Sequence, residues 1–199
     1  MSIRKIAFTA LLAVAGMAMS SASMAQFDGI YFGGGFTRFK ATETALDPAT
    51  QSSFTLGNEE HQGGLNGFLG YAFTFGSLLN IGLEGSYSGQ VGKVSVMSLG
   101  LTVADGLEEA GAFSILPGFK FGTTGLVYAR IGAAQAKLKA QDGSFSQTHK
   151  GMLYGLGMKQ AVTKNVSLLV EYQNYDMKEK DGIKPEATGV LVGVQYGFR

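Results

Sequence analysis

Residues 187–199 read ATGVLVGVQYGFR, and large apolar side chains occupy every second position of this stretch. One set consists of Val190, Val192, Val194, Tyr196 and Phe198, and the other of Gly193, Gln195, Gly197 and Arg199. Only Leu191 breaks the second set. Alternation with a period of two places one set on each face of a β-strand. The stretch therefore predicts a strand with one apolar face and one small or polar face.

Seven further segments follow the same pattern. They span residues 29–40, 63–75, 80–89, 111–121, 126–137, 152–162 and 166–177. The first is the least regular, because Gly33-Gly34-Gly35 obscures its register. No helix is expected after these glycines, so a kinked strand is favoured over a phosphate-binding loop.

The connections between these segments alternate in length. Residues 76–79, 122–125 and 163–165 form short turns, whereas residues 41–62, 90–110, 138–151 and 178–186 form longer, more polar loops. Turns at one end and loops at the other are typical of transmembrane barrels, with the turns in the periplasm. The predicted fold is all-β, an eight-stranded antiparallel up-and-down transmembrane β-barrel with both termini on the periplasmic side.

The first 25 residues have the pattern of a secretory signal peptide. Arg4 and Lys5 precede an apolar run over residues 6–19, and Ser23-Met24-Ala25 provides small residues for cleavage. We therefore expect a signal peptide at 1–25 and one barrel domain at 26–199.

Removing the signal takes away two of 16 basic residues and none of 15 acidic ones, leaving a net charge of −1. This balance disfavours a nucleic-acid partner, and the absence of cysteine excludes disulfides and thiolate metal ligands.

The direction of the apolar face separates a membrane barrel from a soluble, lipocalin-like one. The apolar faces hold roughly thirty residues, many of them Phe, Tyr and Leu, which is more than the lumen of an eight-stranded barrel accommodates. The opposite faces are rich in Gly, Ala and Ser. We therefore expect the large apolar side chains to face lipid. Because Trp is absent, Phe and Tyr must form any aromatic girdle, with Phe75, Phe121, Tyr172, Tyr196 and Phe198 as candidates.

Four motifs carry a resemblance to a known family. They are GFLGY at 67–71, LPGFKF at 116–121, LYGLGM at 153–158 and VGVQYGF at 192–198. Together with the signal, they resemble the porin-family and opacity-type outer-membrane surface proteins that share the OmpA/OmpX-like eight-stranded barrel. The resemblance implies an outer-membrane location and recognition of the C-terminal strand by the barrel-assembly machinery. Family members usually end in an aromatic residue, whereas here Arg199 follows Phe198.

Charged residues at inward positions form the sharpest candidate site. They are Glu84, Lys120, Arg130, Lys159 and Glu171. Each lies toward the turn end of its predicted strand, so we expect all five in one layer of the lumen. Ion pairing would compensate the charges in a confined space and would plug the barrel. A gate or narrow ion path is the alternative, and the usual filling of so small a lumen favours the plug.

The two histidines, His61 and His149, fall in different predicted loops and are candidate ligands for haem or a metal ion. They lack a defined spacing, so solvated loop residues are the favoured interpretation, and we expect no metal and no cofactor. Ser144 and Ser146 lie near His149, but no acid is placed to support them. We therefore expect no catalytic residues and no enzyme activity.

The loop at 90–110 is unusually apolar for an external segment. Its apolar residues are Val94, Val96, Met97, Leu99, Leu101 and Val103. A hairpin that continues the neighbouring strands is favoured, and an exposed contact surface is the alternative.

The expected function is that of a non-enzymatic surface barrel that supports envelope integrity and presents loops for adhesion or partner binding. Its expected partners are outer-membrane lipid, lipopolysaccharide, the barrel-assembly machinery and a host or surface partner. A narrow passive channel or a small-ligand, haem-type binding protein is the alternative.

Overall fold

The strands are long, and they cover most of the chain that the structure describes. This computed structural model describes residues 27–46, 53–56, 61–98, 101–140, 146–178 and 183–198. The predicted signal peptide, residues 1–25, lies outside the described residues. The strands are β1 (Gly29–Leu46), β2 (Ser53–Leu56), β3 (His61–Phe75), β4 (Leu79–Ser98), β5 (Leu101–Phe121), β6 (Gly125–Ala140), β7 (Ser146–Ala161), β8 (Val166–Met177) and β9 (Ile183–Gly197).

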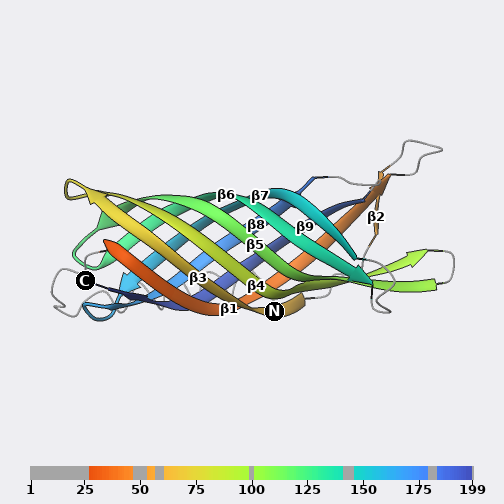
Figure 1. Ribbon diagram of the computed structural model, residues 1–199, viewed down its shortest axis with the longest axis horizontal. Coiled ribbons are helices and arrows are strands. Elements are labelled where there is room, and N and C mark those ends of the chain that lie inside the picture. Colours follow the sequence, from red (N-terminus) through yellow and green to blue (C-terminus); the bar gives the residue numbers. More distant parts are fainter. Residues whose placement is uncertain are drawn as a thin grey trace.

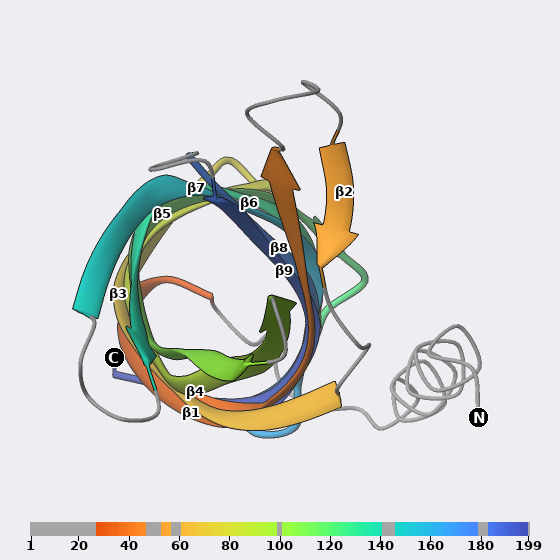
Figure 2. The same ribbon diagram turned by 90° about the vertical axis from the view of Figure 1, so that its right-hand side faces the viewer.

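Eight of these strands form a closed antiparallel barrel (Figure 1). The sheet order runs from β1 through β3 to β9, and β9 pairs again with β1, from Tyr31 opposite Gly197 to Ala45 opposite Ile183. The end-on view shows the resulting ring (Figure 2). The short β2 pairs with the end of β1 and stands outside the ring. The predicted eight-stranded antiparallel barrel is confirmed. No helix in the described part of the chain is long and apolar enough to cross a membrane.

Two of the short turns begin with a glycine in the left-handed region. Gly76 has a φ of 63° and Gly122 a φ of 59°. A side chain at either position would strain this backbone conformation. These glycines let β3 reverse into β4 and β5 reverse into β6 within three residues, 76–78 and 122–124.

Several strands extend beyond their predicted ends at the long-loop side of the barrel. β1 continues to Leu46, β7 begins at Ser146, and β4 and β5 continue as a paired hairpin from Gly92 to Leu107 (Figure 1). The favoured hairpin interpretation of residues 90–110 is thus confirmed. The prediction of an unbroken loop at 41–62 was wrong, because it contains β2. Outside the membrane both strand faces can be polar, so the alternation that marks the barrel wall disappears in the extensions of β1 and β7.

Large apolar side chains face outward from the barrel wall, as predicted. Leu65 is 75% exposed, Phe119 67% and Phe113 61%. All five predicted girdle aromatics are exposed as well, with Phe75 at 54% and Tyr172 at 51%. In water this surface would be a severe aggregation liability, whereas in lipid it is the favourable face of the barrel.

The lumen contains bulkier side chains than the sequence pattern predicts. Five buried aromatic residues of the strands point inward: Tyr31, Phe39, Phe68, Tyr128 and Tyr175. Several lie over glycines on neighbouring strands, so the two sets fit together. A Cβ atom at Gly70 would lie 2.4 Å from the Tyr31 ring, and one at Gly157 would lie 2.5 Å from the Tyr128 ring. Small and large residues therefore alternate around the lumen, as filling a small barrel requires.

Replacing an inward glycine should destabilise the barrel, whereas replacing an outward one should not. Gly157→Ala forces the Tyr128 ring to shift, and we expect a loss of about 1–3 kcal/mol from overpacking. The matched control is Gly89→Ala, because a Cβ atom at Gly89 meets nothing within 4 Å. Urea titration of the refolded barrel, read from the mobility of folded and unfolded bands on gels, measures the difference. Equal midpoints for the two variants would contradict the packing described here.

Candidate functional site

Arg130 joins two buried glutamates in the middle of the lumen. Its Nη2 lies 2.6 Å from Oε1 of Glu84, and its Nε lies 2.6 Å from Oε1 of Glu171. A further hydrogen bond from Nη2 to Oε2 of Glu171 measures 3.0 Å, which makes that pair bidentate. The three side chains are between 0% and 2% exposed. Such short, charge-assisted bonds offset the cost of removing the charges from water.

Neutral donors complete the coordination of the two carboxylates. The Tyr31 hydroxyl donates to Oε2 of Glu84 at 3.0 Å, and the Tyr128 hydroxyl donates to Oε2 of Glu171 at 2.5 Å. The side-chain amide of Gln173 donates to Oε1 of Glu171 at 2.9 Å. Every carboxylate oxygen of the pair thus accepts at least one hydrogen bond. The network consequently ties together β1, β4, β6 and β8 across the lumen.

Lys159 supplies the second positive charge. Its Nζ lies 4.7 Å from the centre of the Tyr31 ring and 4.8 Å from that of the Tyr128 ring. Lys159 is 4% exposed, so the ammonium group sits between two aromatic faces that stabilise a cation. Two carboxylates, one guanidinium and one ammonium make a cluster with no net charge. We call Glu84, Arg130, Lys159 and Glu171 the lumen cluster.

The expectation that Lys120 shares the layer of the other four charges was wrong. Nζ of Lys120 lies 3.9 Å from Oδ2 of Asp28, and its side chain is 16% exposed. Lys120 is the last inward position of β5 before the turn, so it reaches the rim of the barrel and the segment that precedes β1. Strand tilt separates positions that look equivalent when counted from the turns alone.

Apolar groups close the lumen between the cluster and the turn end. Phe27, just before β1, is 6% exposed and packs in one cluster with Leu116, Leu126, Tyr128 and Ala161. The side-chain amide of Asn80 donates to the Phe27 carbonyl at 3.3 Å, which anchors this residue. A residual cavity between Phe27 and Lys159 has a volume of about 10 Å³. That is room for one water molecule at most.

The predicted loop position of His149 was wrong. His149 lies within β7, is 1% exposed and points into the barrel, because β7 begins several residues earlier than predicted. Its Nδ1 is 3.5 Å from the backbone carbonyl of Lys178. His61 is the first residue of β3, and its side chain lies outside the described residues. Within the described part of the chain, no group of three or more metal-ligating side chains occurs.

The sequence pattern did not reveal the neutral members of the site. Tyr31 precedes the irregular glycine run, and Gln173 looked like an ordinary polar position of its strand. Tyr31 reaches Glu84 across the lumen, 53 residues away in sequence, whereas Gln173 bonds Glu171 two residues away on the same face of β8. A weak signal was available for Tyr31 and Tyr128, since a tyrosine at an inward position needs a hydrogen-bond partner.

Removing the central cation should weaken the barrel strongly. Arg130→Met leaves Glu84 and Glu171 buried without their shared partner, and we expect a loss of about 3–5 kcal/mol in the free energy of unfolding. The control is Lys137→Met, which removes a surface pair with Glu109 at 3.7 Å and should cost less than about 1 kcal/mol. Urea titration followed by gel mobility compares the two. Similar midpoints would show that the network contributes little.

Comparison with known proteins places this geometry in a family. Residues 9–198 match the family model described as "Outer membrane protein beta-barrel domain". Among solved structures, the chain is similar to Ail, the attachment invasion locus protein of Yersinia pestis, solved with the heparin analogue sucrose octasulfate. That match has 15% identity, covers 85% of this chain and 100% of Ail, and has a TM-score of 0.50.

Two further structures agree on the fold. Neisserial surface protein A matches with 18% identity over 85% of this chain and 97% of its own, at a TM-score of 0.51. OprG of Pseudomonas aeruginosa matches with 12% identity over 89% of this chain and 99% of its own, at a TM-score of 0.55. No curated protein matches the chain. The chain forms a closed eight-stranded wall with a lipid-facing surface, and its residues 9–198 match the family model. It therefore belongs to the outer-membrane β-barrel family and is an outer-membrane protein.

Proposed function

We propose that this protein is a non-enzymatic surface barrel with a plugged lumen, which contributes to envelope integrity and presents extracellular loops for adhesion or partner binding. The observation that carries the proposal is the lumen cluster. Its four charged side chains are buried and compensated, and apolar side chains fill the space on its turn side. A barrel closed in this way acts through its stability and its surface, and transport plays no part.

The filled lumen argues against the alternative of a narrow passive channel. A conducting path needs a continuous hydrated route, whereas Arg130 bridges β4, β6 and β8 across the middle of this barrel. A haem-type binding role loses support as well, because one of its two candidate ligands, His149, is buried in the barrel.

The long-loop end supports a role in surface contacts. The β4–β5 hairpin extends past the barrel wall, and β2 pairs with the end of β1 on the same side (Figure 1). In barrels of this family the long connections face the exterior. The solved complex of Ail with a heparin analogue shows that one structural neighbour binds a ligand. We propose the hairpin over residues 92–107 as the partner-binding element here.

Electrical recordings test the plug. Planar lipid bilayers that contain the refolded protein should show no stable large conductance, because the lumen cluster and its apolar neighbours leave no open path. Protein-free bilayers and bilayers with heat-unfolded protein serve as controls. Reproducible open-channel steps from protein with folded gel mobility would contradict the plugged barrel.

Shortening the hairpin tests the contact role. A variant in which a tight turn replaces residues 92–107 should keep folded gel mobility, since these residues lie beyond the barrel wall. Bacteria expressing the variant should lose adhesion to cultured host-cell monolayers. The control replaces residues 141–145 in the connection between β6 and β7. Adhesion that survives the hairpin deletion would remove this element from the proposal.

A further inference from the structure

Three outward glycines are not required by the packing of the barrel itself. Gly67, Gly85 and Gly111 lie on β3, β4 and β5, and their missing side chains point away from the lumen. A Cβ atom would meet nothing within 4 Å at Gly67, and only a backbone oxygen near 4 Å at Gly85 or Gly111. Inward glycines such as Gly157 contact aromatic rings instead. Glycine inside a strand often marks the close approach of a ligand or of another backbone.

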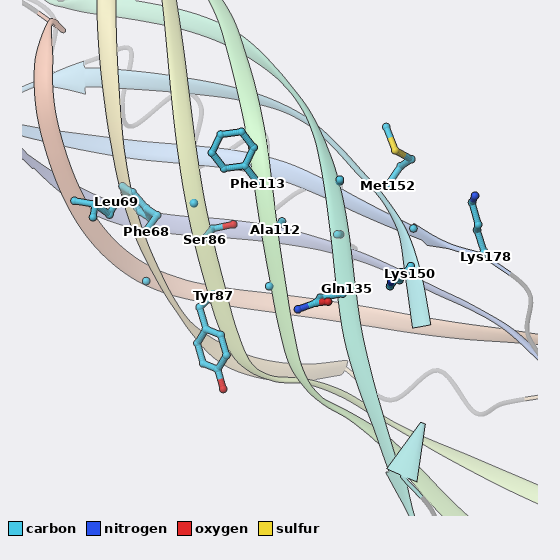
Figure 3. Close-up of a pocket in the computed structure, with 16 residues that line it drawn as sticks. Phe68, Leu69, Ser86, Tyr87, Ala112, Phe113, Gln135, Lys150, Met152 and Lys178 are labelled. Atoms are coloured by element: carbon cyan, nitrogen blue, oxygen red, sulfur yellow. The ribbon is translucent and has the colours of Figure 1, made fainter. Parts of the chain in front are cut away.

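These glycines form the floor of a hollow on the outer wall of the barrel (Figure 3). Strand register places Tyr87 between Gly67 and Gly111, and Gly85 between Leu69 and Phe113. The large neighbours stand out from the wall, with Tyr87 53% exposed and Phe113 61% exposed. The hollow measures about 870 Å³, which lies in the range of small-ligand sites, about 300–1,000 Å³.

One end of the hollow is cationic. Lys150 and Lys178 line it together with Gln135, and both lysines are exposed. Gln135 is paired with Lys150 across β6 and β7, and the Lys178 amide donates to the Lys150 carbonyl at 2.8 Å. The side chains of the two lysines therefore project from the wall next to each other. They lie toward the long-loop end of the strands, which in this family is the extracellular side.

We propose that this hollow seats one lipid A moiety of lipopolysaccharide, with an acyl chain along Gly67, Gly85 and Gly111 and a phosphate on Lys150 and Lys178. The glycine floor offers smooth apolar contact, and the two ammonium groups complement the phosphate charge at the depth of the outer-leaflet headgroups. The inference deepens the lipopolysaccharide partnership expected from the sequence and rests on it. It does not depend on the plugged lumen or the adhesive hairpin.

A second copy of this chain fits the hollow less well than a lipid does. In a two-fold dimer within a membrane both copies point the same way, so the same surface meets itself. Lys150 and Lys178 of one copy would then approach the same lysines of the other, and like charges repel. An anionic amphiphile removes this conflict, because its phosphate neutralises the lysines while its chain covers the apolar floor.

Native mass spectrometry of the refolded, detergent-solubilised protein with purified lipid A tests the proposal. Gly85→Leu should fill the floor and reduce lipid A binding about tenfold, and Lys150→Gln with Lys178→Gln should reduce it to a similar degree. Two controls match these changes. Gly89→Leu alters an outward glycine of the same strand outside the hollow, and Lys164→Gln removes an exposed lysine at the opposite end of the barrel. Both controls should bind within about twofold of the unchanged protein.

Each alternative has its own readout. Equal binding by Gly85→Leu and Gly89→Leu would overturn the acyl-chain seat. Undiminished binding of dephosphorylated lipid A would overturn the phosphate contact, and equal binding of a phosphatidylethanolamine would remove the assignment to lipid A. A dimer of the lipid-free protein that Gly85→Leu dissociates would assign the hollow to a second copy. All variants are compared only after folded gel mobility is shown, and bilayer recordings on the same samples report separately on the plug.

Discussion

The hydrogen bonds between β1 and β9 leave the sheet without a free edge. In hydrocarbon every unpaired backbone group costs several kcal/mol, so this closure makes the fold compatible with a membrane. Closure with eight strands also sets the width of the lumen. A lumen of this width leaves no open channel, and side chains must fill it. The outward face of each strand then presents large apolar side chains to lipid. The side chains on the inward face must pack together and fill the lumen.

Filling the centre combines two kinds of chemistry. Rings such as those of Tyr31 and Tyr128 cover inward glycines on neighbouring strands, and they also serve the lumen cluster with their hydroxyl groups and faces. Arg130 satisfies two carboxylates that would otherwise be costly to bury. Packing and charge compensation therefore depend on the same residues. The plug, the register of four strands and the stability of the barrel consequently form one structural unit.

The barrel could be predicted from sequence because lipid imposes a strict period of two on its wall. The same reasoning placed Glu84, Arg130, Lys159 and Glu171 on inward faces, and the structure brings these four together. It misplaced His149, because polar residues at the start of β7 hide the alternation. It also placed Lys120 in the wrong layer, since that assignment depends on strand tilt, which no single strand encodes. It missed Gln173, although this residue shares a strand face with Glu171 two positions away.

The central claim is that the apolar face contacts lipid while charged groups lie inside. The chain has no cysteine, so one introduced at Leu69, Ile131 or Val192 can carry a single spin label. Collision rates with dissolved oxygen and with a water-soluble nickel chelate then report the environment of each label in bilayers. The account predicts high oxygen and low nickel accessibility at all three positions. High nickel accessibility there, from protein with folded gel mobility, would contradict it.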